Sequence, residues 1–102
     1  MQQNAFEVIN ATGQTNYITA YGKMRIINLS FRPSIILQAA QTYTIYTFSA
    51  THRPTNIVDS FTLNSLGHRY RVQINTNGEI ALSPYDNIAV GELLLSNMAY
   101  AI

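Results

Sequence analysis

The segment HRYRVQINTNGEIALSP, residues 68–84, constrains the fold of this chain more than any other. Apolar and polar residues alternate on both sides of the dipeptide Asn77-Gly78. Alternation with a period of two is typical of a half-buried β-strand, and Asn-Gly is a frequent turn sequence. The apolar positions are Tyr70, Val72, Ile74, Ile80 and Leu82. The segment therefore predicts a β-hairpin with one apolar face.

The length of the loop decides whether the apolar faces of the two strands match. A two-residue loop at the Asn-Gly dipeptide would place apolar residues of one strand opposite polar residues of the other. A three-residue loop that includes the preceding threonine instead pairs Ile74 with Ile80 and Val72 with Leu82. We therefore expect a type I turn followed by Gly78 in the left-handed region, which forms a G1 bulge. Gly78→Val should destabilise the hairpin, because a β-branched residue is costly at positive φ.

The rest of the chain also reads as short strands separated by turn signals, which favours an all-β fold. We expect an antiparallel β-sandwich or barrel of jelly-roll-like type, in a single domain spanning residues 1–102. The window SIILQAAQ, residues 34–41, reads either as a helix or as a short strand followed by a turn. The other predicted strands are Ala5–Asn10, Tyr17–Tyr21, Met24–Phe31, Thr42–Phe48, Ile57–Leu63 and Glu92–Tyr100.

Three of these strands carry apolar residues on both faces. The apolar positions change phase between Ile26 and Ile27 in one strand and between Ile45 and Tyr46 in another. A β-bulge explains such a change, and so does a strand buried on both faces. The last strand, from Leu93 to Tyr100, is also apolar on both faces. Because a chain of 102 residues can bury few strands twice, we expect contact with neighbouring subunits.

The composition is low in charge and lacks cysteine. Only 11% of the residues are charged, against about 25% in a typical soluble domain. This low fraction favours a surface that is partly covered by other subunits, or one that is polar without being ionic. The absence of cysteine excludes disulfides, thiolate metal sites and a cysteine nucleophile. No apolar run reaches the length of about 18 to 20 residues that spans a bilayer, and no signal peptide is recognisable.

The motifs of common enzymes and cofactor sites are absent from the sequence. The carboxylates occur singly, and there is no nucleophile elbow or glycine-rich phosphate loop. A metal site would have to be assembled across strands from His52, His68, Asp59 and Asp86. We therefore expect no enzyme, no cofactor and no metal.

Nucleic-acid binding finds little support either. Arg69 and Arg71 share one face of their predicted strand, whereas Tyr70 points the other way. A binder of single strands places basic and aromatic groups on the same face. The net charge is only +1, so the long-range attraction to phosphates is weak. We interpret the two arginines as solvated side chains on an outer face.

The order of motifs resembles a family of phage domains. These are the C-terminal head domains of receptor-binding and upper-baseplate proteins in siphophages of Gram-positive bacteria. The resemblance covers about four-fifths of the chain, from Lys23 onward. The matching motifs, in order, are MRIINLSF, TYTIYTFS, THRP, VDSFTLNS, RYRVQINTNGEIAL and GELLLSNMAYAI.

The resemblance implies a homotrimer of β-sandwich heads in the virion, at the tip of a phage tail or baseplate. It implies reversible binding of a host cell-wall or cell-surface saccharide, together with contacts to other tail or baseplate proteins. The chain would then be the head of a longer tail protein. We expect no membrane insertion and no nucleic-acid partner.

Six loop residues have the side chains that saccharide sites use. The segment SPYDN, residues 83–87, provides the best single cluster, although such residues are also ordinary turn formers. The resemblance implies a stiff corner at Arg53-Pro54, because proline fixes φ and restricts the preceding residue. At the same corner, His52 and Arg53 are also candidates for lining a ligand-binding groove. The candidate residues are Tyr85, Asp86, Asn87, His52, Arg53 and His68.

The chain contains no tryptophan, which is the platform expected in many sugar-binding heads. The alternative function is therefore a structural adaptor that docks other virion proteins without binding glycan. In an adaptor, the low charge and the apolar strands would serve protein contacts.

Overall fold

Eight antiparallel strands form the regular structure of the computed structural model, which describes residues 6–8, 17–48 and 50–102. The expectation of an all-β fold is confirmed. A 3₁₀ turn, η2 (Ala50–His52), follows β4. Among the described residues, no helix has the length and apolar character that crossing a membrane requires. The strands are β1 (Phe6–Val8), β2 (Tyr17–Tyr21), β3 (Met24–Pro33), β4 (Tyr43–Thr47), β5 (Val58–Leu63), β6 (Arg69–Ile74), β7 (Glu79–Pro84) and β8 (Leu94–Ala101).

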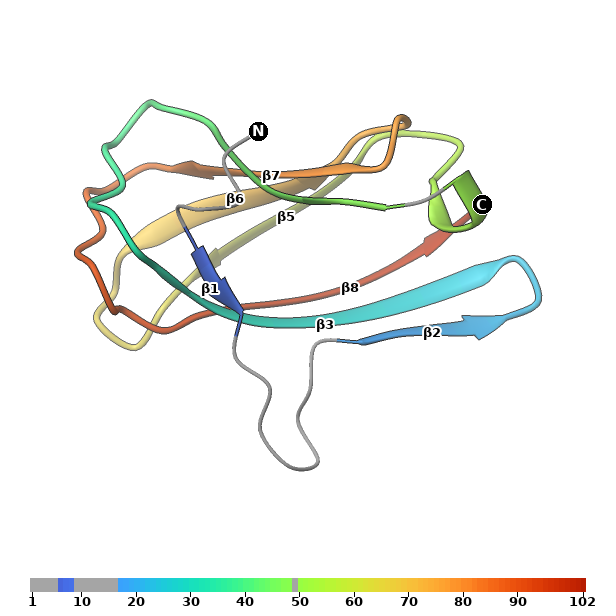
Figure 1. The fold of residues 1–102 in the computed structure, drawn as a ribbon, viewed down its shortest axis with the longest axis horizontal. Coiled ribbons are helices and arrows are strands. Elements are labelled where there is room, and N and C mark those ends of the chain that lie inside the picture. Colours follow the sequence, from blue (N-terminus) through green and yellow to red (C-terminus); the bar gives the residue numbers. More distant parts are fainter. Residues whose placement is uncertain (1–5, 9–16, 49) are drawn as a thin grey trace.

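The strands form two sheets that face each other (Figure 1). In the first sheet β3 pairs with β8 along its length, and β1 and β2 pair with the other side of β3. The second sheet has the order β4-β7-β6-β5. As a result, β5 and β8 are both edge strands, and they lie close to each other.

The hydrophobic core lies between the two sheets. Alternation along each strand turns one set of side chains inward, where they are removed from water. A bridge between Leu37 and Ile88 adds two further buried side chains and connects the loop after β3 to the loop after β7. The main core residues are Ile27, Phe31, Leu94, Met98 and Tyr100 from the first sheet and Tyr70, Val72, Ile74, Ile80 and Leu82 from the second.

The predicted register of the β6–β7 hairpin is confirmed. Ile74 pairs with Ile80 and Val72 with Leu82, so the apolar side chains share the inner face. Gly78 has a φ of 88°, as the G1 bulge requires. A Cβ atom at this position would lie 2.6 Å from the carbonyl oxygen of Phe48, so the glycine is required by space as well as by conformation.

The two phase changes have different origins. In β4 the register shifts between Thr44 and Tyr46, which confirms a bulge. The ladder between β3 and β8 has no shift, so a bulge in β3 is not the explanation there. Met24 and Ile26 simply point outward and remain exposed. The window at residues 34–41 forms the bridge at Leu37 followed by a turn, which agrees with the strand-and-turn interpretation.

The last strand, β8, also has one buried face and one exposed face within the chain. Leu94 is fully buried, whereas its neighbour Leu95 is 48% exposed. This alternation continues to the end of β8, where every second residue is exposed. The apolar residues on the outer face of β8 are therefore not covered by the described part of the chain. Residues Ala5, Ile9 and Asn10 of the first predicted strand lie outside the described residues.

Candidate functional site

Among the described side chains of the second sheet, the most exposed apolar ones lie on the outer face of β5. Phe61 and Leu63 point outward and are 66% and 61% exposed. The polar residues that alternate with them, Ser60 and Thr62, point inward and are half-buried. This orientation follows from the ladder with β6, where Phe61 pairs with Arg71. Burial of apolar surface alone would favour the opposite orientation, so this face is suited to an interaction.

Phe61 forms an aromatic pair with Tyr85. The two ring centroids are 6.3 Å apart and the ring planes differ by 16°, a stacked arrangement. Tyr85 follows β7 directly, and its N–H donates to the carbonyl oxygen of Arg69, which extends the ladder by one residue. Tyr85 is 48% exposed, so both rings remain accessible to solvent. The pair spans the outer face from β5 to the end of β7.

An ion pair fixes the turn that carries Tyr85. One oxygen of Asp86 accepts hydrogen bonds from the backbone N–H of Arg69 at 2.8 Å and from its Nε at 3.0 Å. The other oxygen accepts from Nη2 of Arg69 at 3.1 Å. The hydrogen bonds from the Arg69 side chain and backbone lower the pKa of Asp86 to about 2. The Asp86 carboxylate is therefore committed to holding the turn.

Arg71 lies beside Phe61 on the same outer face. Its Nε atom is 3.9 Å from Oδ1 of Asp59, which also accepts a hydrogen bond from Nε2 of Gln73 at 3.1 Å. Within the described residues, the buried Nε of Arg71 has no hydrogen-bond partner. An aromatic surface, a guanidinium, a carboxylate and an amide thus lie together on this face. We refer to Asp59, Phe61, Arg71, Gln73 and Tyr85 as the outer-face cluster.

A groove of about 410 Å³ separates β5 from β8. Within the described part of the chain, no residue with a formal charge lines it. On its floor the hydroxyl of Tyr70 donates to the carbonyl oxygen of Leu95 at 2.6 Å and accepts from its N–H at 3.0 Å. Burial raises the pKa of Tyr70, which keeps this donor protonated. The lining residues are Ser60, Phe61, Thr62, Leu63, Asn64, Ser65, Tyr70, Leu93, Leu95, Ser96 and Asn97.

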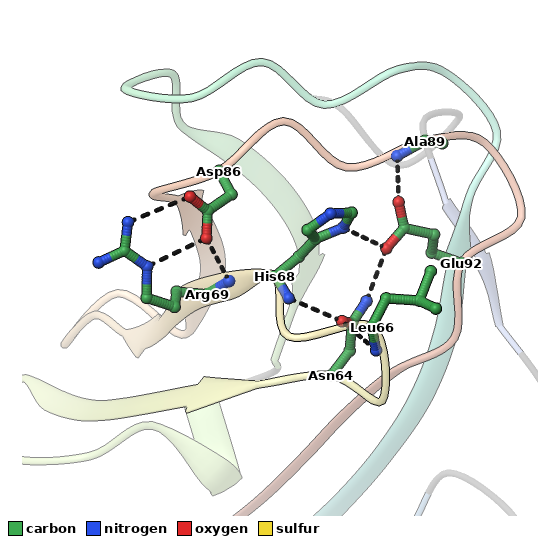
Figure 2. A network of polar contacts seen from close by, with 7 residues as sticks. All are labelled: Asn64, Leu66, His68, Arg69, Asp86, Ala89 and Glu92. Atoms are coloured by element: carbon green, nitrogen blue, oxygen red, sulfur yellow. Dashed lines mark hydrogen bonds and ion pairs between the residues drawn. The ribbon is translucent and has the colours of Figure 1, made fainter.

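A polar network joins the end of β5 to the start of β8 (Figure 2). Oε1 of Glu92 accepts from Nδ2 of Asn64 at 2.7 Å and from Nδ1 of His68 at 2.6 Å. Its other oxygen accepts from the N–H of Ala89 at 2.6 Å. Oδ1 of Asn64 accepts from the backbone N–H groups of Leu66 and His68, which closes the β5–β6 loop. The network is therefore made mainly of loop-closing contacts.

The carboxylate of Glu92 is well suited to this position. Its side chain is only 7% exposed, and burial by itself would raise its pKa. The hydrogen bonds from Ala89, Asn64 and His68 together outweigh burial, so the pKa of Glu92 lies below its usual range. Because the ionised carboxylate only accepts, Nδ1 of His68 carries a proton in this contact.

The connection between β4 and β5, which contains η2, lies at the opposite end of the sheets, beside the β6–β7 hairpin (Figure 1). His52 ends η2, and Arg53 packs against this hairpin, where a Cβ atom at Gly78 would lie 3.0 Å from its Cγ. Nδ1 of His52 accepts from Nε of the buried Arg25 at 3.1 Å, and its carbonyl oxygen accepts from the hydroxyl of Tyr100 at 2.7 Å. Nε of Arg53 donates to the carbonyl oxygen of Phe48 at 3.4 Å. The Arg53-Pro54 segment forms the connection between β4 and β5, and these contacts brace that corner.

The six residues singled out in the sequence are therefore divided between two ends of the molecule. His68 and residues 85–87 flank the Tyr70–Pro84 end of the β6–β7 ladder, whereas His52 and Arg53 lie near its turn at the far end. Oδ1 of Asn87 accepts from the N–H of Ala39, so this amide braces the loop after β3. The side chains of the other five make the hydrogen bonds described above, whereas the ring of Tyr85 is exposed and stacks on Phe61.

Sequence reasoning missed Phe61 and the groove, and it treated Arg71 only as a solvated side chain. One signal was present in the motif VDSFTL: Phe61 and Leu63 share one face of the predicted strand, and polar residues alternate with them. The register with β6 decides that this apolar face points outward, and that register depends on the loop from Asn64 to His68.

No group of three or more potential metal ligands occurs among the described residues. Comparisons with protein-family models and with curated proteins found no match to this sequence. The outer-face cluster is therefore the feature of the described residues that best indicates a function.

Proposed function

We propose that this chain is a non-catalytic binding domain of the phage receptor-binding head type, which reversibly binds a saccharide on the host cell surface. The observation that carries the proposal is the exposed, stacked pair of Phe61 and Tyr85 beside the guanidinium of Arg71. The family resemblance supplies the biological setting, the tip of a phage tail or baseplate.

The chemistry of the outer-face cluster matches that of a sugar ring. A sugar offers apolar C–H groups on its faces and hydroxyls at its rim, and aromatic rings provide large, rigid apolar surfaces for such faces. Arg71 offers guanidinium donors, Asp59 offers acceptors, and the amide of Gln73 offers both. Asp86 contributes indirectly, because its bonds to Arg69 hold Tyr85 in place.

Saccharide titrations followed by NMR amide shifts test this proposal. Glucose, galactose and N-acetylglucosamine oligomers serve as probes of the wild-type chain. We expect shifts confined to β5, β6 and residues 83–87, and affinity at least about tenfold weaker in Phe61→Ala and in Tyr85→Ala, a loss of about 1.4 kcal/mol. Tyr21→Ala is the matched control, because Tyr21 is also exposed but lies on β2.

An equal loss of affinity in Tyr21→Ala would contradict the placement of the site. Shifts that map to the other end, around His52 and Arg53, would contradict it as well. If none of the saccharides produced shifts, binding of these sugars would be ruled out, and the adaptor candidate would be favoured.

The second candidate is a structural adaptor that docks other virion proteins through β5. The inverted orientation of β5 favours it, because Phe61 and Leu63 expose apolar surface of the kind that protein interfaces cover. The two candidates differ at Leu63, whose aliphatic side chain offers no ring for stacking. Leu63→Ala should leave saccharide affinity within about twofold of wild type if the aromatic pair carries binding.

A further inference from the structure

The free edge of β8 is an interaction surface separate from the outer-face cluster. Natural edge strands are usually protected by charge, proline, a bulge or short length. β8 has none of these: it is eight residues long, contains no charged residue or proline, and keeps an unbroken register with β3. The other edges in the described sheets are protected, because β5 contains Asp59, β4 contains a bulge, and β1 and β2 are three and five residues long.

The hydrogen bonds of Leu95 show which main-chain N–H and C=O groups of β8 point away from β3. The hydroxyl of Tyr70 contacts both the N–H and the C=O of Leu95, on the side away from β3. Main-chain groups alternate sides along an antiparallel ladder, so those of Asn97, Ala99 and Ala101 also point away from β3. The hydrogen bond from Ile102 N–H to the oxygen of Lys23 agrees with this alternation. Within the described residues, β8 has no partner strand on this side.

A row of N–H and C=O groups at every second residue is complementary to another extended polypeptide strand. Tyr70 occupies the edge at Leu95, and the strand ends at Ala101, so the open stretch runs from Asn97 to Ala101. This stretch is symmetric about Ala99. In an antiparallel pair of β8 strands, Ala99 lies opposite its own counterpart and Asn97 lies opposite Ala101 of the second copy.

We propose that two copies of this chain associate by antiparallel pairing of their β8 edges around Ala99. The small, uncharged side chains at all three open positions present no charge repulsion and little bulk to a second copy. Every open main-chain position then gains a partner, and the sheets of the two copies become continuous. The contact leaves the outer face of β5, β6 and β7 free for ligand, so it stands or falls independently of saccharide binding.

A two-fold contact of this kind gives a different assembly from the trimer that the family resemblance implies. Light scattering from low to high micromolar concentration distinguishes the two. We expect a mass near twice the chain mass of 11.4 kDa. A monomer at all concentrations would overturn the β8 pairing, and a mass of three chains would overturn it in favour of the trimer.

Ala99→Lys places two cations opposite each other at the two-fold axis and should convert the dimer to a monomer. Ala89→Lys is the matched control, because it makes the same exchange at an exposed loop residue and should remain a dimer. A folded Ala99→Lys variant that kept the wild-type mass would show that the contact lies elsewhere.

Amide hydrogen exchange in the wild-type chain tests the same contact without a substitution. In a dimer, the amides of Asn97 and Ala99 should exchange at least about tenfold more slowly at high than at low protein concentration. The amides of Ser96 and Met98 face β3, so they should be protected at both concentrations. Rapid exchange at Asn97 and Ala99 under all conditions would overturn the proposal.

Discussion

β5 and β8 border the same groove, but they place their apolar residues on opposite sides. In β8, Leu94 and Met98 point into the core, and the exposed positions are mostly small or polar. In β5, Phe61 and Leu63 point outward, and only hydroxyl residues and Val58 face inward. The inward side chains of β8 are positioned by the core, whereas those of β5 are positioned by the ladder with β6. The core-facing apolar residues of β8 therefore stabilise the fold, while Phe61 and Leu63 of β5 are available for binding.

The largest expected effect separates the two faces of β8. Leu94→Glu buries a carboxylate in the core and should lower the free energy of unfolding by on the order of 4 kcal/mol. Leu95→Glu, one residue later, should change it by less than about 0.5 kcal/mol, because Leu95 points to solvent. Urea unfolding of both variants measures the difference. Equal destabilisation would mean that the outer face of β8 is also covered.

The next effect concerns the contact that crosses the groove. Tyr70→Phe removes both hydrogen bonds to the main chain of Leu95 while keeping the buried ring. We expect a loss of about 1 to 2 kcal/mol of unfolding free energy, because the partly buried N–H and C=O of Leu95 lose their partner. Tyr43→Phe, which removes the hydroxyl that accepts from Gln38 N–H, provides a comparison within the same core. An unchanged stability in Tyr70→Phe would show that water replaces the phenol on this edge.

The polar network around Glu92, which joins the end of β5 to the start of β8, should make stability depend on pH. The pKa of Glu92 is lowered below its ordinary value of 4.5, so the unfolded chain binds more protons at this site. The stability that Glu92 contributes is therefore complete above 4.5 and is lost as the pH falls through the folded value. Glu92→Gln should reduce stability at about pH 7 and should flatten the decline of stability as the pH falls below about 5, which urea unfolding at a series of pH values measures.

Asp86 should act over a pH range that begins lower, below its ordinary pKa of 3.8. Its pKa is about 2 in the folded chain against an ordinary value of 3.8, so its contribution is lost between these values as the pH falls. Asp86→Asn should therefore change the slope of stability with pH only below about pH 4. Unfolding measured across this range distinguishes the two carboxylates. A change of slope near neutral pH in Asp86→Asn would contradict the assignment.

The smallest expected effect concerns the one inward polar residue of β8. The hydroxyl of Ser96 is buried and has no hydrogen-bond partner among the described residues. Ser96→Ala should therefore leave stability unchanged or raise it by up to about 1 kcal/mol, since no hydrogen bond is lost. Ser60→Ala on the inner side of β5 is the matched control. A clear loss of stability in Ser96→Ala alone would reveal a partner for this hydroxyl, such as a bound water.

The local chemistry of turns was predictable to the level of single residues. The chain from Tyr70 to Leu82 contains its own alternation and turn signal, so the register of the hairpin and the positive φ of Gly78 could be derived. The bulge in β4 was also visible as a change of phase. In β3 the same signal had another cause, because apolar residues can point outward without a bulge.

The candidate site was predictable only in part. Tyr85 was identified because it follows Pro84 in a turn, but its partner Phe61 comes from a strand 24 positions earlier. Asp86 was identified as a ligand-binding candidate, whereas in the structure Arg69 engages both of its oxygens. His52 and His68 each precede an arginine, and only the fold shows that they lie at opposite ends of the sheets, with Arg25 and Glu92 as their respective partners.

The sequence by itself determined the all-β class, most strand positions and the register of the hairpin between β6 and β7. These features depend on the two-residue period and on local turn geometry, which act over a few neighbouring residues. Only the tertiary structure decided which face of β5 points outward, which edge of β8 stays open and how the groove forms between them. Those features depend on pairing between strands distant in the sequence, where core burial and register outweigh the local pattern.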